Sequence, residues 1–101
     1  MRILVLLNPT NKRGTKTAYT QFRAFLRSEG FLPIQPEVYM RVIPSRKSYP
    51  VYFSRISART PETGTIIIGI LTENQYRSFT YLTGDIPLQE REIGSNNVII
   101  I

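Results

Sequence analysis

The chain has 101 residues, a net charge of +6 at neutral pH, and neither cysteine nor histidine. This length fits one domain with a modest hydrophobic core. The composition excludes a disulfide framework, a thiolate metal site and histidine chemistry, so any catalysis would fall to carboxylates, lysine, tyrosine or the backbone. No apolar run approaches the roughly 20 residues that span a bilayer, and Met1-Arg2 leads directly into a strand pattern instead of a signal-peptide core. We therefore expect a single cytoplasmic domain, residues 1–101, with no membrane partner.

Charge is divided unevenly along the chain. Residues 1–61 hold eleven basic and two acidic side chains, whereas residues 62–101 hold two basic and five acidic ones. Such a cationic surface attracts polyanions. The alternative is that the excess lysine and arginine only keeps the protein soluble. We interpret the first three-fifths of the chain as a phosphate-binding surface, with nucleic acid as the leading ligand.

The first two elements are a strand and a helix. Residues 2–7 are a continuous apolar run before the turn at Asn8-Pro9, which predicts a central strand covered on at least one face. From Thr15 or Lys16 the spacing predicts an amphipathic helix that ends at Gly30, a residue typical of helix C-caps. Its core-facing stripe is Ala18, Tyr19, Phe22, Phe25 and Leu26.

The other side of this helix is basic. Charged residues recur there at helical spacing, and two more precede the helix. Arginine can grip a pair of phosphate oxygens and lysine acts as a point charge, so the set suits sequence-independent contacts with DNA. We predict a DNA-binding ridge, named here the α-ridge, formed by Lys12, Arg13, Lys16, Arg23 and Arg27.

Residues 31–34 and 38–43 are extended by composition. Pro33 and Pro36 cannot donate hydrogen bonds to a neighbouring strand, so we expect this region at a sheet edge or across a bulge, and not as a central strand.

A second helix is expected next. Ser45 or Ser48 can cap it and Pro50 fits its first turn. Its buried side is predicted to be Tyr49, Tyr52, Phe53 and Ile56. A second basic group either flanks the α-ridge or is a solvated helix face; it consists of Arg46, Lys47, Arg55 and Arg59.

The last part of the chain predicts short elements. Residues 65–71 are the strongest strand signal and are expected beside the first strand. Thr72 and Gln75 have the form of a capping box, which predicts a short helix through Phe79. A strand fragment and turn follow at residues 81–85, and residues 97–101 form a terminal apolar strand. That strand could pair within its own chain or with a second copy.

The order strand, helix, strand, strand, helix, strand predicts a ferredoxin-like α+β sandwich, with an extra strand at the C-terminus. Both helices would cover one face of an antiparallel sheet. The other face then needs cover, which a homodimer would supply.

Several motifs together resemble the CRISPR-associated Cas-two family, and most closely its type II branch. The resemblance spans nearly the whole chain in the right order. It rests on an apolar strand ending in a turn with Pro9-Thr10, the helix Tyr19-x-x-Phe22-Arg23-x-Phe25-Leu26-x-Ser28-Glu29-Gly30-Phe31, the strand Gln35-x-x-Val38-Tyr39, and Leu71-Thr72-Glu73-x-Gln75-Tyr76 leading to Tyr81-Leu82-x-Gly84-Asp85.

The resemblance implies a homodimer whose last strand crosses onto the partner's sheet. It also implies that the dimer sits between two dimers of the Cas-one integrase, where it holds the duplex part of a prespacer and helps to set the length of DNA inserted into the CRISPR array. Many members are described as metal-dependent nucleases because of an aspartate at the end of the first strand.

The chain departs from that family pattern where the aspartate is expected. The position falls on Asn8, or on Leu7 if the turn is aligned one residue differently. Mg²⁺ prefers anionic oxygen ligands, and a hydrolytic water needs a base or a metal to activate it. We therefore expect no catalytic residue, no metal site and no cofactor, with Mg²⁺ required only if the protein is a nuclease. The family's Gln-x-Ser-Val motif reads Gln35-Pro36-Glu37-Val38 here, and Glu37 is interpreted as a surface carboxylate on an edge strand rather than a metal ligand.

Three functions remain open from the sequence. The first is a non-catalytic DNA-binding scaffold in CRISPR adaptation, and the second is a metal-dependent endonuclease of the same family. The third is a nuclease-type toxin or an RNA-binding module on the same sandwich, although the aromatic sheet motif of RNA-recognition domains is missing.

Overall fold

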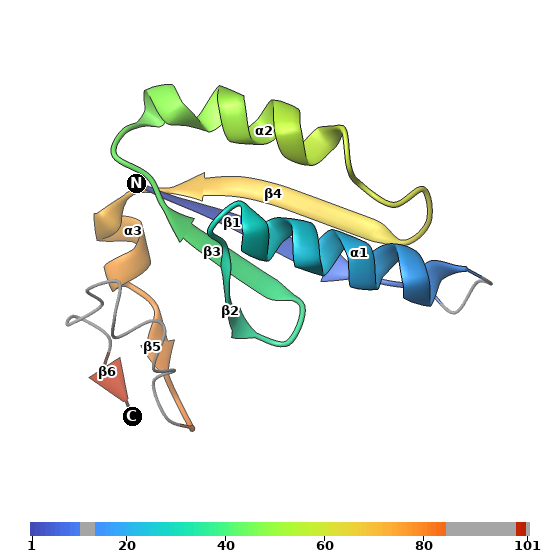
Figure 1. Ribbon diagram of the computed structural model, residues 1–101. Coiled ribbons are helices and arrows are strands. Elements are labelled where there is room, and N and C mark those ends of the chain that lie inside the picture. Colours follow the sequence, from blue (N-terminus) through green and yellow to red (C-terminus); the bar gives the residue numbers. More distant parts are fainter. Residues whose placement is uncertain (11–13, 85–98, 101) are drawn as a thin grey trace.

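A four-stranded antiparallel sheet carries two helices on one face (Figure 1). The computed structural model describes residues 1–10, 14–84 and 99–100. The strand order is β2-β3-β1-β4. The elements are β1 (Arg2–Asn8), α1 (Thr15–Ser28), β2 (Leu32–Gln35), β3 (Val38–Val42), the 3-10 turn η1 (Arg46–Ser48), α2 (Tyr49–Ser57) and β4 (Thr65–Leu71). This arrangement confirms the predicted ferredoxin-like α+β fold.

Strand β1 is interior because both of its edges are paired. Val5 lies opposite Tyr39 of β3 and Ile68 of β4. Alternation along the strand turns Ile3, Val5 and Leu7 toward the helices, where all three are buried. The predicted central strand, with β4 beside it, is confirmed.

Helix α1 packs on the sheet through the predicted stripe. Tyr19, Phe22 and Leu26 are buried in the core. The helix stops at Gly30, whose φ of 85° lies in the left-handed region that only glycine enters without strain. A Cβ atom at this position would also collide with the Arg41 guanidinium. The predicted glycine cap is confirmed.

Strands β2 and β3 form a hairpin, and of these two strands only β2 lies at an edge of the sheet. The pairing register shifts between Pro33 and Gln35, which confirms the expected bulge. Strand β3 instead lies between β2 and β1, so the expectation that residues 38–43 avoid the interior of the sheet is wrong. Pro33 lies in β2 and Pro36 in the turn, so β3 keeps every backbone N–H and can pair on both sides.

Helix α2 begins at Tyr49 and has Pro50 in its first turn, and Ser48 takes the N-cap position without a side-chain hydrogen bond. Ile56 is buried and Tyr52 packs partly against the core. Phe53 is 46% exposed, so its predicted burial is wrong. A nine-residue helix buries a narrow stripe, and residue 53 lies beside that stripe.

The chain then forms an arm near the start of β1 (Figure 1). It consists of α3 (Glu73–Arg77), β5 (Thr80–Tyr81) and β6 (Ile99–Ile100), with β5 and β6 paired in parallel. Thr72 and Gln75 form the predicted capping box, each accepting a hydrogen bond from the other's backbone N–H. Of the predicted strand 97–101, residues 97, 98 and 101 lie outside the described part, as does the turn residue Asp85. Exchange of this strand between two chains stays a prediction.

The sheet face opposite α1 and α2 is apolar and partly open. Leu6, Val42 and Ile67 are exposed on it. The segment after α3 passes over part of this face and leaves a groove of about 570 Å³. Among the described residues, no helix is both long and apolar enough to cross a bilayer.

Candidate nucleic-acid interface

Helix α1 carries the described part of the α-ridge. Lys16 and Arg27 are exposed, as the helical spacing predicts, and Arg23 is half-buried between them. Lys12 and Arg13 lie outside the described residues. The geometry therefore leaves two exposed cations on the described ridge, Lys16 and Arg27, with Thr20 between them.

Arg23 is held by a carboxylate from the β2–β3 turn. Its Nε and Nη2 donate to the two carboxylate oxygens of Glu37, each at 2.7 Å. The two side chains keep 31% and 29% of their surface exposed. The hydrogen bond from Arg23 lowers the pKa of Glu37 more than burial raises it. The two charges thus cancel at the middle of the ridge.

The residues of the second basic group differ in their contacts. Arg46 and Lys47 are exposed on η1. Arg55 forms an ion pair with Glu29 (3.0 Å), and the Arg59 guanidinium lies 5.0 Å from the centre of the Phe25 ring. Within this group, therefore, Arg46 and Lys47 are the residues best placed to form an exposed cationic surface.

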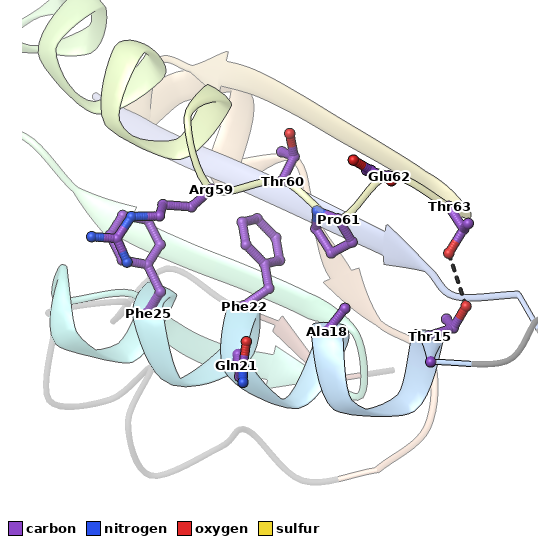
Figure 2. A pocket seen from close by; sticks show the side chains of 11 residues that line it. Thr15, Ala18, Gln21, Phe22, Phe25, Arg59, Thr60, Pro61, Glu62 and Thr63 are labelled. Atoms are coloured by element: carbon purple, nitrogen blue, oxygen red, sulfur yellow. Dashed lines mark hydrogen bonds between the residues drawn. The ribbon is translucent and has the colours of Figure 1, made fainter.

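Arg59 borders a groove on the side of α1 away from the α-ridge. The groove has a volume of about 460 Å³ and lies between α1 and the loop that joins α2 to β4 (Figure 2). Phe22, Phe25 and Pro61 give it apolar walls. The Thr15 and Thr63 hydroxyls are hydrogen-bonded at 2.8 Å at one end, which ties α1 to this loop.

The residue at the tip of β1 is Asn8, which has no carboxylate. Asn8 is exposed and pairs with Thr65 at the start of β4. Beside it, the Tyr19 hydroxyl donates to the Thr63 carbonyl at 2.7 Å. Burial, followed by the charge of Glu37, raises the pKa of Tyr19, so the phenol stays protonated at neutral pH. Within the described ranges, no three Asp or Glu side chains gather into a group that could hold a metal ion.

Sequence reasoning missed the role of Glu37 and the position of Arg41. Glu37 was interpreted as a plain surface carboxylate, but it neutralises Arg23, which lies 14 positions away. The Arg41 guanidinium lies beneath the end of α1. It donates to the Glu29 carbonyl at 3.1 Å, and its centre lies 4.9 Å from the centre of the Tyr52 ring. Strand alternation could have shown that Arg41 shares the helix-facing side of the sheet with Tyr39.

Comparisons with known proteins support the family resemblance of the motifs. No family model matches the chain. It is 33% identical to the CRISPR-associated endoribonuclease Cas2 of Lacticaseibacillus rhamnosus, over 99% of this chain and 100% of the relative. Identity to the protein of the same name from Ligilactobacillus salivarius is 32% over the same shares. The Acidovorax ebreus protein of that name is 30% identical over 99% of both chains. The chain therefore belongs to the CRISPR-associated Cas-two (Cas2) family.

Proposed function

We propose that the protein is a DNA-binding scaffold of the CRISPR adaptation complex. It acts in the cytoplasm as a homodimer that bridges two dimers of the Cas-one integrase and holds duplex prespacer DNA for insertion into the CRISPR array. It performs no hydrolysis and needs no metal. The observation that carries the proposal is the alignment with Cas2 relatives over 99% of the chain, combined with Asn8 at the tip of β1.

Electrostatics support the DNA contact. Lys16 and Arg27 are exposed on one side of α1, and Arg46 and Lys47 add positive charge on η1. Phosphate contacts of this kind bind duplexes with little regard to sequence and release counterions. A scaffold that accepts any prespacer needs this type of binding.

Exposed apolar surface supports the homodimer. Leu6, Val42 and Ile67 are exposed on the sheet face opposite α1 and α2. Strand β4 is also an end strand of the four-stranded sheet, so its outer edge can accept a strand from a second chain. The strand that the proposal assigns to this edge is the C-terminal one.

A metal-dependent endonuclease is the second candidate, favoured by the name endoribonuclease that the relatives carry. In that case Mg²⁺ would have to bind near the amide oxygen of Asn8, which is neutral and a weaker ligand than a carboxylate. The two candidates therefore differ in whether the purified chain cleaves RNA or DNA when Mg²⁺ is added.

Duplex binding by the full chain tests the scaffold. Affinity for a labelled duplex, with and without the Cas-one integrase, is measured over a series of salt concentrations. We expect Arg27→Gln to weaken binding and to flatten the plot of log K against log salt by about 0.9 for each lost phosphate contact. Arg77→Gln is the matched control, because it removes an exposed arginine from α3. Absence of salt-sensitive binding by the wild-type chain, alone and with the integrase, refutes the scaffold.

The same preparations test the nuclease. If the protein is a scaffold, we expect RNA and DNA to remain uncut both with Mg²⁺ and with EDTA. Cleavage that requires Mg²⁺, disappears in Asn8→Ala and survives in Arg27→Gln would replace the scaffold with the nuclease.

A further inference from the structure

We propose that Glu37 is an internal competitor for phosphate, which occupies the binding edge of Arg23 and lowers the affinity of the α-ridge for nucleic acid. The inference rests on the proposed DNA-binding function. It identifies a residue that tunes the strength of that binding.

The geometry of the Arg23–Glu37 pair is the geometry of phosphate recognition. Two parallel N–H groups, Nε and Nη2, meet two oxygens at 2.7 Å each. A phosphate presents the same pair of oxygens to the same edge of a guanidinium. Only one anion can fill that edge, so a DNA phosphate must displace the carboxylate or use the remaining N–H groups of a neutralised pair.

Glu37 is fixed where it can compete. Its φ of 66° is the only positive value among the described non-glycine residues, at the tip of the β2–β3 turn. Its carbonyl accepts the Leu7 N–H at 2.9 Å, which ties the turn to β1. An L-residue at this φ is strained relative to glycine. The Glu37 carboxylate therefore reaches Arg23 from a turn whose backbone is tied to β1.

The position of the pair explains why it matters for the ridge. Arg23 lies between Lys16 and Arg27 on one side of α1, so its charge would join the two ends into one track. With Glu37 present, the middle of the track has no net charge. Counterion release counts only phosphates that are newly neutralised, so Arg23 contributes little to the salt dependence of wild-type binding.

Salt-dependent duplex binding by Glu37→Gln tests this inference. Glutamine keeps the size of the side chain but removes its charge. We expect tighter binding and a slope of log K against log salt that is steeper by about 0.9 for each Arg23 that gains a phosphate. Arg23→Gln combined with Glu37→Gln leaves the middle of the ridge neutral, as in wild type, and should return the slope to the wild-type value.

Two controls separate this effect from a general change of charge or fold. Glu62→Gln removes one negative charge from the exposed α2–β4 loop and should not steepen the slope. Glu37→Gly suits the positive φ and should bind like Glu37→Gln if removal of the carboxylate is what matters.

Two results overturn the inference. They are an unchanged or flatter slope for Glu37→Gln, and a slope for the double variant that is as steep as that of Glu37→Gln. If the wild-type chain shows no salt-sensitive duplex binding at all, the proposed function fails as well. If wild-type binding is salt-sensitive but the Glu37 variants have the same slope as wild type, the competitor role fails and the proposed function stands.

Discussion

Replacement of Glu73 by alanine should destabilise the fold through the buried Arg2. The Arg2 side chain keeps only 3% of its surface exposed, and its Nε and Nη2 donate to the Glu73 carboxylate at 3.0 to 3.2 Å. Its other described contacts are the Tyr76 ring, 3.7 Å from Cζ to the centroid, and the Met40 sulfur at 4.0 Å. None of these neutralises the charge, so Glu73→Ala leaves a buried cation without a counter-ion.

The magnitude follows from the burial of the two partners. Removal of one partner from a fully buried ion pair costs about 3 to 5 kcal/mol, whereas an exposed pair contributes about 0 to 1 kcal/mol. Glu73 keeps 43% of its side chain exposed, so water partly replaces it. We therefore expect a loss of about 2 kcal/mol for Glu73→Ala. In a domain of this size, that loss lowers the melting temperature by roughly 10 °C.

Urea unfolding followed by circular dichroism measures this loss, because the chain has no tryptophan to report it by fluorescence. All variants are compared at one protein concentration. Arg77→Ala on the same helix is exposed and should stay within about 0.5 kcal/mol of wild type. Adding Arg2→Met to Glu73→Ala removes the unpaired buried charge and should recover part of the lost free energy of unfolding. The reasoning is refuted if Glu73→Ala costs no more than Arg77→Ala, or if the double variant is less stable than Glu73→Ala.

Two further predictions concern the stability of the fold in acid and the turn at Gly64. The pKa values of Glu37 and Glu73 are lowered, first by hydrogen bonds from their arginine partners. Their stabilisation is therefore present above the unfolded pKa of 4.5 and is lost as the pH falls through the lower folded pKa. Urea midpoints measured down the pH scale should fall more steeply for wild type than for Glu37→Gln/Glu73→Gln, and equal slopes would contradict this. Separately, Gly64→Ala should cost more than 1 kcal/mol, since φ is 80° and the new Cβ would lie 2.6 Å from the Asn8 carbonyl oxygen. Gly14→Ala has a similar φ of 83° but no atom within 4 Å, so thermal melting should show a smaller loss, and equal losses would refute the steric argument.

Local patterns in the sequence were sufficient for most of the fold. The buried stripe Tyr19, Phe22 and Leu26 follows from helical spacing, and the stop at Gly30 follows from the backbone freedom of glycine. The Thr72 capping box likewise involves residues three positions apart. Such features depend on near neighbours in the chain, which is why they can be predicted before the strand order is known.

The candidate site was predicted less completely. The α-ridge was recognised from the spacing of Lys16, Arg23 and Arg27, and two of these are exposed. Nothing local indicated that Arg23 would be neutralised, because Glu37 belongs to another element. The DNA contact itself remains a prediction that the binding experiment decides.

By itself, then, the sequence determined which segments form helices and strands, which side of each is apolar, and that the first part of the chain is cationic. Only the tertiary structure decided which charges meet. Arg2 pairs with Glu73 across 71 positions and Arg23 with Glu37 across 14. It also decided that β3 is interior, although prolines lie beside it. The physical reason is that hydrophobic periodicity and caps act within one or two turns, whereas ion pairs and strand neighbours depend on how completed elements pack.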